Sequence, residues 1–278
     1  MPTYIRILTT SDGQLHPVDY GAANLTEAAA HEPHNGVYTV LNTFNTYQTL
    51  KLTAHLDRLE DSARRADIAL VLDRALLRRA LRQMIEDAGF GDVRLRITVP
   101  HDTPQNFILT LEPYHPPAVA IITAGVRVMT APDSARTNPA AKTTDWMHQR
   151  KALADARPEG IYDVILTDAA GNLLECLGAN FYAIRDGHLY TAVEGVLRGI
   201  SQQIVLDVAP DILPVEPQPL NLRDLPRIDE AFLTSSSRAV IPIVAIDDQV
   251  LGDGKPGSLT LRIRSAYLDW MDKNLEDL

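Results

Sequence analysis

The apolar residues of this 278-residue chain follow two different patterns, one on each side of the adjacent prolines Pro116 and Pro117. Before the pair, residues 52–68 and 72–90 carry apolar side chains at helical spacing, and the second segment ends near Gly89, which is typical of a helix C-cap. β-branched and aromatic residues predict strands at 4–8, 36–44, 93–99 and 106–114. Beyond the prolines the pattern becomes rich in short strands.

Turn signals divide the second half into many short segments. The expected strands are 120–130, 161–168, 173–184, 230–237 and 240–246. The expected helices are 145–157, a segment that starts near 199–201 and runs to 209, and 257–275. The fold class is therefore predicted to be mixed α/β (α+β) with two domains. Residues 1–117 form a small N-terminal α/β domain and residues 118–278 form a larger, strand-rich C-terminal domain, with the proline pair as the linker.

Charge and composition exclude several classes of function. The chain has 26 Lys and Arg against 36 Asp and Glu, a net charge of −10, which argues against nucleic acid as a partner. It contains no run of about 18 apolar residues and begins without the pattern of a signal peptide, so we expect no membrane association and a cytoplasmic protein. A single cysteine, Cys176, excludes an internal disulfide and a Cys-rich metal site, and we expect no metal.

The segment from Lys142 to Ser201 carries the most chemical information. Lys142 is one of only five lysines, and it lies at the end of a polar loop directly before a predicted helix. Glu175 follows a predicted strand and turn. Gly199, Ile200 and Ser201 open a further helix, whose free N–H groups and dipole suit a phosphate. An amine, a carboxylate and an anion site are the three groups that pyridoxal phosphate requires.

Six motifs in a fixed order resemble the class IV aminotransferases, the fold-type IV pyridoxal-phosphate family that includes branched-chain and D-amino-acid aminotransferases and aminodeoxychorismate lyase. The motifs are GVYTVLNTF, HLDRLEDSA, the run DxxGxLxE followed by ANFY, LRGIS, FLTSSSRAVIPI, and DGKPG before the closing helix. Together they span nearly the whole chain. The resemblance implies a pyridoxal 5′-phosphate cofactor and a homodimer.

The resemblance also implies a role for individual residues around the cofactor ring. Lys142 matches the family's Schiff-base lysine, which forms the internal aldimine and acts as the catalytic residue. Lys151, nine residues later, is its competitor and is expected to be a helix-surface lysine. Glu175 matches the partner of the pyridine nitrogen. Tyr38 matches an active-site tyrosine near the substrate, with a core tyrosine as the alternative.

The expected phosphate-binding residues come from both halves of the chain. Arg58 matches the family's phosphate-binding arginine, and a forked guanidinium suits that ligand. Ile200 and Ser201 would offer a backbone N–H and a hydroxyl. Ser236 falls where the family usually has a threonine, and Ser235 assists it.

The substrate contacts depart from the family's D-amino-acid branch. The segment PHDTPQNF lacks the arginine and histidine that D-amino-acid aminotransferases use there for the substrate carboxylate. Arg94 and Arg96 lie on one face of the preceding strand and are candidate substitutes, with a solvated strand face as the alternative.

These expectations lead to one preferred function and two alternatives. The preferred function is an aminotransferase that moves an amino group between an amino acid and a 2-oxo acid through Lys142. The run ECLGAN resembles the Glu-Cys-x-Ala-Ala-Asn run of aminodeoxychorismate lyase, which eliminates pyruvate with the same cofactor, so a lyase stays open. The third alternative is a non-catalytic homologue that binds a small molecule.

Overall fold

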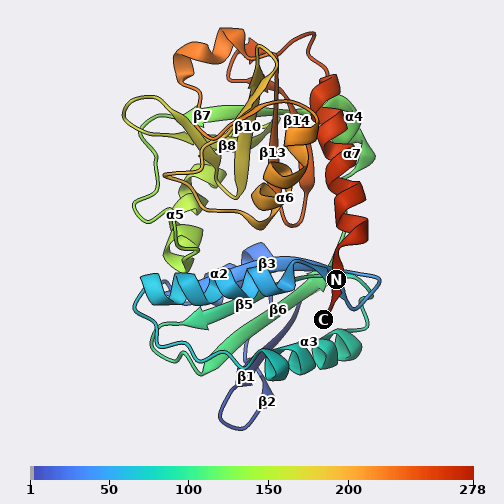
Figure 1. The fold of residues 1–278 in the computed structure, drawn as a ribbon. Helices are drawn as coiled ribbons and strands as arrows, with labels where there is room; N and C mark the ends of the chain where they lie inside the picture. The colour runs from blue at the N-terminus through green and yellow to red at the C-terminus, as the bar shows by residue number, and fades with distance from the viewer. Residues whose placement is uncertain (1–2) are drawn as a thin grey trace. The chain divides into compact units, whose positions relative to one another are not determined.

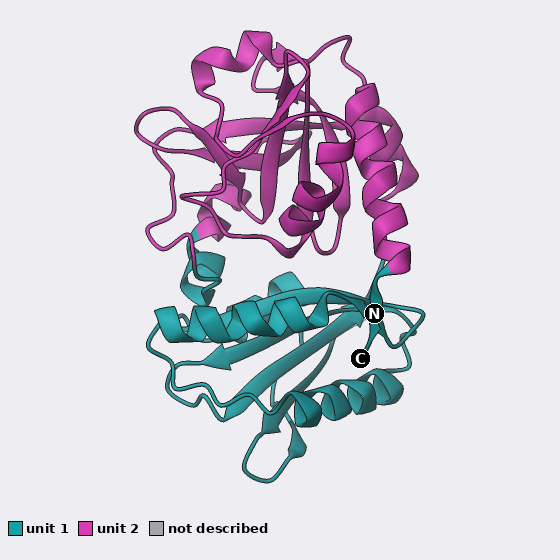
Figure 2. Ribbon diagram, viewed as in Figure 1, with its two compact units in different colours: residues 1–115, 141–149, 274–278 teal, residues 116–140, 150–273 magenta. Residues whose placement is uncertain are grey.

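The computed structural model describes residues 3–278, which form two compact units. Unit 1 extends to His115 and also includes Ala141–Gln149 and Asn274–Leu278, and unit 2 contains Pro116–Ala140 and Arg150–Lys273 (Figure 2). Each unit has its own sheet and hydrophobic core. Each unit is assembled from segments that are discontinuous in the sequence. The continuous domain ranges 1–117 and 118–278 stay a prediction.

Unit 1 is built on a seven-stranded antiparallel sheet, with strand order β16-β4-β3-β5-β6-β1-β2 (Figure 1). The strands are β1 (Tyr4–Thr9), β2 (Gln14–Pro17), β3 (Gly36–Phe44), β4 (Gln48–Leu50), β5 (Val93–Pro100), β6 (Asn106–Pro113) and β16 (Leu275–Asp277). The expected strands at 4–8, 36–44, 93–99 and 106–114 are confirmed, and β5 and β6 pair as a hairpin.

Two amphipathic helices, α2 (Leu52–Arg65) and α3 (Arg74–Ala88), cover one face of this sheet. In α2 the buried Leu52, Leu56 and Leu59 recur at helical spacing, which gives the helix one apolar stripe. The Asp73 side chain accepts the Leu76 N–H and caps α3, which ends where Gly89 adopts a φ of 64°. Helix α1 (Leu25–Ala28) and the 3-10 turn η1 (Ala29–His31) complete the unit.

Unit 2 contains a nine-stranded sheet that closes on itself, because β9 pairs with both β8 and β10. The ring runs β10-β13-β14-β7-β8-β9 and returns to β10. The strands of unit 2 are β7 (Val126–Ala131), β8 (Ile161–Thr167), β9 (Leu173–Cys176), β10 (Ala179–Arg185), β11 (His188–Tyr190), β12 (Val215–Glu216), β13 (Glu230–Ser235), β14 (Ala239–Ile246) and β15 (Gln249–Val250). A closed ring leaves its strands no free edge.

Unit 2 also contains helices and 3-10 turns, in whole or in part. They are α4 (Val119–Ala124), α5 (Thr144–Asp155), α6 (Ile200–Val208), α7 (Ser258–Lys273) and the 3-10 turns η2 (Ala209–Asp211) and η3 (Leu222–Arg227). Helix α5 begins in the segment that belongs to unit 1 and ends in unit 2. None of the helices in residues 3–278 is both long and apolar enough to cross a lipid bilayer.

Two strand predictions in unit 2 are wrong. Residues 120–130 were expected to form one strand, but 119–124 form α4, and Gly125, with a φ of 72°, separates this helix from β7. A short apolar run fits either structure, so its periodicity does not decide between them. Residues 173–184 form a hairpin rather than one strand, since Cys176 pairs with Ala179 across Leu177 and Gly178. The mixed α/β class with a strand-rich second half is confirmed.

Candidate active site

The backbone of Lys142 is attached to unit 1 on both sides. Its N–H donates to Ser62 Oγ of α2 at 3.1 Å, and its carbonyl accepts the Tyr38 N–H of β3 at 3.0 Å. The next residue, Thr143, forms an isolated antiparallel bridge with Val37. The half-buried side chain places Nζ 4.7 Å from the centroid of the Tyr38 ring, a cation–π arrangement. These two hydrogen bonds and this single bridge fix where the lysine side chain begins.

Arg58 lies on α2 in the same region of unit 1. Its Nη2 donates to Thr39 Oγ1 at 3.3 Å, and the same hydroxyl lies 2.8 Å from His55 Nδ1. Burial holds the pKa of His55 well below its ordinary value, and the positive charges of Arg58 and Lys142 lower it further. The neutral imidazole thus adds no third positive charge. Unit 1 brings Lys142, Arg58 and Tyr38 together, and their roles stay predictions.

Glu175, the carboxylate predicted to face the cofactor ring, lies on β9 in unit 2 and is 5% exposed. It accepts the Leu197 N–H at 3.3 Å and faces Arg136 Nη1 at 3.3 Å. The side chains of both ion-pair partners are buried, so the arginine compensates the cost of an ionised carboxylate there. Arg136 lies in the polar loop between β7 and α5 and was not among the predicted residues.

A tight turn sets the direction of Glu175. Leu177 and Gly178 join β9 to β10, and Glu175 pairs with Asn180 across this hairpin. Arg150 donates to the Leu177 carbonyl, and a Cβ added to Gly178 would lie 2.8 Å from Arg150 Nη1. A side chain at position 178 would displace the end of the flexible Arg150 side chain from this contact.

The start of α6 lies beside this hairpin. Asn180 Nδ2 donates to the Leu197 carbonyl at 2.8 Å, and a Cβ on Gly199 would lie 2.0 Å from Asn180 Oδ1. Gly199 is the N-cap and makes no side-chain cap hydrogen bond, while Ile200 and Ser201 are buried. Ser201 Oγ lies 2.9 Å from Tyr267 Oη of α7. The helix thus presents its N-terminal N–H groups next to Asn180.

The hydroxyl-rich turn between β13 and β14 lies on the other side of Asn180. Asn180 pairs with Thr234, which precedes Ser235 in β13. Ser235 and Ser236 are half-buried, and Ser235 Oγ accepts Arg238 Nε–H at 3.0 Å. Unit 2 therefore brings Glu175, the start of α6 and this turn to neighbouring positions around Asn180.

The two arginines expected at the substrate have carboxylate partners within unit 1. Arg96 is buried and pairs with the buried Glu32, which also accepts the Thr98 hydroxyl. Arg94 Nη1 lies 3.1 Å from Glu112. Both guanidiniums thus belong to ion pairs along β5, and their role as substrate-binding residues stays a prediction. Lys151 is exposed and pairs with Asp155 on the same helix.

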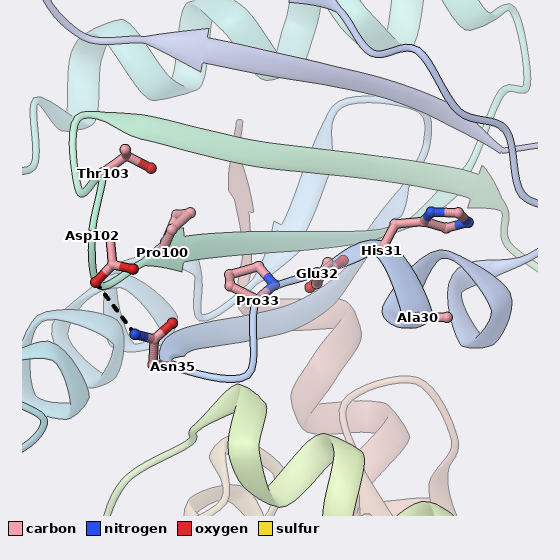
Figure 3. A pocket seen from close by; sticks show the side chains of 8 residues that line it. All are labelled: Ala30, His31, Glu32, Pro33, Asn35, Pro100, Asp102 and Thr103. Carbon is pink, nitrogen blue, oxygen red and sulfur yellow. Dashed lines mark hydrogen bonds between the residues drawn. The ribbon is translucent and has the colours of Figure 1, made fainter.

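A pocket of about 360 Å³ lies on unit 1 (Figure 3). It is lined by Ala30, His31, Glu32, Pro33, Asn35, Pro100, Asp102 and Thr103. Asn35 Nδ2 donates to Asp102 Oδ1 at 3.3 Å across its rim. None of the predicted site residues lines it. Among residues 3–278, no group of three or more His, Cys, Asp or Glu side chains is arranged to hold a metal ion.

Sequence reasoning missed two arginines of unit 2. Arg136 pairs with Glu175, which is 39 residues later in the sequence. Arg238 donates to Ser235 within the turn between β13 and β14. The polar loop around Arg136 gave no periodicity that could mark a buried residue. Arg238 stood inside a recognised motif, FLTSSSRAVIPI, at a position to which no role was assigned.

Comparisons with known proteins identify the family of this chain. A sequence model of the family described as amino-transferase class IV matches residues 36–246. The chain is 27% identical over 254 residues to a D-alanine aminotransferase of Listeria innocua, covering 84% of this chain and 86% of that protein. It is 27% identical over 239 residues to a putative branched-chain-amino-acid aminotransferase of Methanocaldococcus jannaschii, covering 78% and 81%.

Solved structures share the fold over almost the full length. The T.th. branched-chain amino acid aminotransferase with pyridoxamine 5′-phosphate superposes with a TM-score of 0.81 at 19% identity, covering 98% of each chain. The branched-chain aminotransferase of Thermoproteus uzoniensis with norvaline gives 0.80 at 21% identity, covering 100% and 99%. The family match covers most of the chain and includes both sets of candidate residues. The chain belongs to the class IV aminotransferases, pyridoxal-phosphate-dependent enzymes of the transferase type.

Proposed function

We propose that this enzyme transfers an amino group between an amino acid and a 2-oxo acid, with Lys142 as the point of covalent attachment of the cofactor. The observation that carries the proposal is the anchoring of Lys142 through both of its backbone groups, in the same part of unit 1 as Arg58. The side chain of Lys142 is also half-buried, with Nζ over the Tyr38 ring, whereas the side chain of a surface lysine extends into solvent. Lys151, exposed and paired with Asp155, is the contrasting case.

Each unit, taken by itself, contains groups that suit pyridoxal phosphate. The cofactor needs an amine for its aldehyde, an ionised carboxylate for its ring nitrogen and several donors for its phosphate. Lys142 supplies the amine, and Glu175 is a buried carboxylate kept beside a guanidinium. Arg58, the N–H groups at the start of α6 and the hydroxyls of Ser201, Ser235 and Ser236 are donors suited to phosphate.

When bound, pyridoxal phosphate supplies a carbonyl carbon that accepts amines and a protonated ring that delocalises the electron pair left on the substrate Cα. The residues of the chain move and hold the protons. Lys142 Nζ removes the proton from the substrate Cα as a general base and later returns a proton as a general acid. Its tether through two backbone hydrogen bonds restricts where Nζ can reach.

Glu175 keeps a proton on the ring nitrogen. A carboxylate stabilises a cationic N–H only if the carboxylate itself stays ionised, and Arg136 at 3.3 Å favours that ionised form. The Leu197 N–H, also at 3.3 Å, fixes the orientation of the carboxylate. Arg136 thus acts through Glu175 on the electron-accepting strength of the ring.

The substrate class of the relatives gives the first compounds to test. D-alanine and branched-chain amino acids are named as substrates in the relatives' names. We propose small and branched aliphatic amino acids as amino donors and their 2-oxo acids as acceptors. Arg94 and Arg96 are engaged in ion pairs with Glu112 and Glu32, so the proposal assigns the substrate carboxylate to neither.

The test is to find where the cofactor attaches. The purified protein, saturated with pyridoxal phosphate, is reduced with borohydride, digested and analysed by mass spectrometry. The pyridoxyl group is expected on Lys142, and the borohydride-fixed label is expected to be lost in Lys142→Ala and to persist in Lys151→Ala. A pyridoxyl group on another lysine, or no cofactor band in the wild-type protein, contradicts the proposal.

The lyase alternative rests on the run ECLGAN at residues 175–180. Incubation with aminodeoxychorismate, with pyruvate release as the readout, tests it against the amino-acid panel on the same preparation. The homodimer and the cytoplasmic location stay predictions, and light scattering of the purified protein tests the first.

A further inference from the structure

Arg238 connects three segments of unit 2 through three different donors. It lies in the turn between β13 and β14, half-buried, with its guanidinium 5.5 Å from the centroid of the Tyr162 ring. Nε donates to Ser235 Oγ at 3.0 Å, and Nη1 donates to Asp163 Oδ2 of β8 at 3.1 Å. Nη2 donates to the Gly178 carbonyl at 3.2 Å. A planar fork with fixed donor directions is suited to such a three-way contact, and an ammonium group is not.

The first of these contacts determines what the Ser235 hydroxyl can do. A guanidinium has donors but no acceptor, so Ser235 Oγ must accept the hydrogen bond from Nε. The hydroxyl proton of Ser235 is then available to be donated elsewhere. A phosphate has only acceptors to offer, so Arg238 leaves Ser235 in the form that an anion requires.

The third contact reaches the hairpin that carries Glu175. The Gly178 carbonyl belongs to the turn between β9 and β10, three residues after Glu175. Arg150 holds the neighbouring Leu177 carbonyl of the same turn. Arg238 therefore links the hydroxyl-rich turn directly to the hairpin on which the carboxylate lies.

The second contact keeps the guanidinium in place. The side chain of Asp163 is 7% exposed, and its other oxygen accepts the Val164 N–H. Burial alone would lower the pKa of Arg238, but the facing carboxylate of Asp163 raises it above the ordinary value. The turn itself ends at Ala239 with a φ of 51°, a left-handed conformation that disfavours alanine, so it needs side-chain contacts to hold it.

We propose that Arg238 is a positioning residue for the cofactor phosphate: it fixes the hydroxyl of Ser235 as a donor and holds the β13–β14 turn in register with the Glu175 hairpin. This inference rests on the proposed function, because it takes the turn to bind the phosphate of pyridoxal phosphate. It assigns to Arg238 no contact with the cofactor.

The experiment compares two ligands that differ only in the phosphate. Dissociation constants of pyridoxal phosphate and of pyridoxal are measured by absorbance titration of the apoprotein for the wild type and for Arg238→Lys, which keeps a positive charge opposite Asp163. Lysine loses the fork, so we expect the affinity for pyridoxal phosphate to fall about tenfold while that for pyridoxal changes less than about twofold. A general loss of structure would instead lower the affinity for pyridoxal phosphate and for pyridoxal by similar factors.

Two further variants make the result independent of folding defects. Asp163→Asn is the matched control, because its amide oxygen can still accept the Nη1 hydrogen bond and keep the guanidinium in place, while the charge of the ion pair is lost. It is expected to lower the melting temperature without changing the preference for the phosphorylated ligand. If Arg238→Lys does not fold, the double variant Arg238→Met with Asp163→Leu removes both charges together and is titrated instead.

A double-mutant cycle locates the effect. If Arg238 acts through Ser235, substitution of Arg238 has a smaller effect on pyridoxal-phosphate affinity in a Ser235→Ala background than in the wild type. An unchanged preference for pyridoxal phosphate over pyridoxal in Arg238→Lys, or equal effects in the two backgrounds, overturns the inference. A wild-type protein that binds neither ligand instead overturns the proposed function.

Discussion

The two units hold their candidate site residues in different ways. In unit 1, Lys142 is attached through backbone hydrogen bonds to α2 and β3, and its side chain extends over the Tyr38 ring. In unit 2, Glu175 and Ser235 are held by side chains, the guanidiniums of Arg136 and Arg238. Backbone hydrogen bonds fix the position of Cα but still allow the terminal atoms of the side chain to move. A hydrogen bond from a neighbouring guanidinium fixes the terminal carboxylate or hydroxyl itself.

This difference matches the work that each group is proposed to do. The amine of Lys142 must shift between atoms to carry a proton, so a fixed base and a mobile tip are an advantage. The carboxylate of Glu175 and the hydroxyl of Ser235 only have to stay in place, which favours rigid, preorganised partners. The comparison predicts that substitutions in unit 1 alter the reaction more than the fold, and that substitutions of the unit 2 arginines alter both.

The largest effect is expected from Lys142→Ala. Loss of the proton-transferring amine should reduce the rate of transamination by at least about 10³-fold. Alanine retains the N–H and carbonyl that bond to Ser62 Oγ and the Tyr38 N–H, so the melting temperature of the apoprotein should change little. Steady-state kinetics and thermal melts of Lys142→Ala and Lys151→Ala measure both quantities. A large loss of stability in Lys142→Ala would show that the side chain also supports the fold.

Next in size is the effect of Arg136→Met on stability. This change leaves the Glu175 carboxylate buried without its cation, which should cost about 3 kcal/mol in the free energy of unfolding. The double variant with Glu175→Gln removes both charges and should recover most of this loss. Denaturant unfolding of the apoprotein provides the measurement. Additive losses in the two single variants and the double variant contradict a coupled pair.

His55 in unit 1 should give a pH-dependent effect. Its pKa in the folded protein is lowered, so below the ordinary value of 6.5 the unfolded chain binds a proton that the folded chain does not. Stability should therefore fall as pH decreases from 6.5 towards the lowered pKa, by at most about 1.4 kcal/mol per pH unit. His55→Gln should flatten this slope, and His115→Gln, at an exposed position, should leave it unchanged. Equal slopes in all three proteins count against a buried neutral His55.

The smallest effect concerns the turn of unit 2. Ala239 adopts a φ of 51°, which glycine tolerates without strain, so Ala239→Gly should stabilise the apoprotein by up to about 1 kcal/mol. Ala152→Gly makes the same exchange at an exposed position of α5 and should destabilise by about the same amount. Thermal melts of both variants provide the test, and two shifts of the same sign contradict it.

Much of the fold followed from periodicity, and the exceptions have physical causes. The strands and helices of unit 1 each bury one clear face, and there the expected ranges agree with β3, α2 and α3. Both strands of the 173–185 hairpin are buried along nearly their full length, so the apolar run continues through Leu177 and the turn leaves little polar signal. Strands that are buried on both faces lack the alternation of apolar and polar residues, so the sequence does not show where one strand ends and the next begins.

The candidate site was predictable where short motifs carry it. Lys142, Arg58 and Tyr38 lie together in unit 1, and Glu175, Ser201 and Ser235 lie around Asn180 in unit 2. The partners that hold them were not predictable. Arg136 meets Glu175 across 39 positions, and Glu32 meets Arg96 across 64. No local pattern encodes which distant charge compensates a buried one, because pairing at that range depends on the completed fold.

Residues 141–149 and 274–278 belong to unit 1, although most of unit 2 lies between them in the sequence. Strand β16 pairs with β4, and the Leu278 N–H bonds to the Tyr47 carbonyl. During synthesis on the ribosome, the first 115 residues emerge long before the strand that completes their sheet and well before the lysine segment that pairs with β3. Unit 1 therefore reaches its final form only after residues 274–278 are translated, so the unit that carries Lys142 is completed only after the segments of unit 2 have been made.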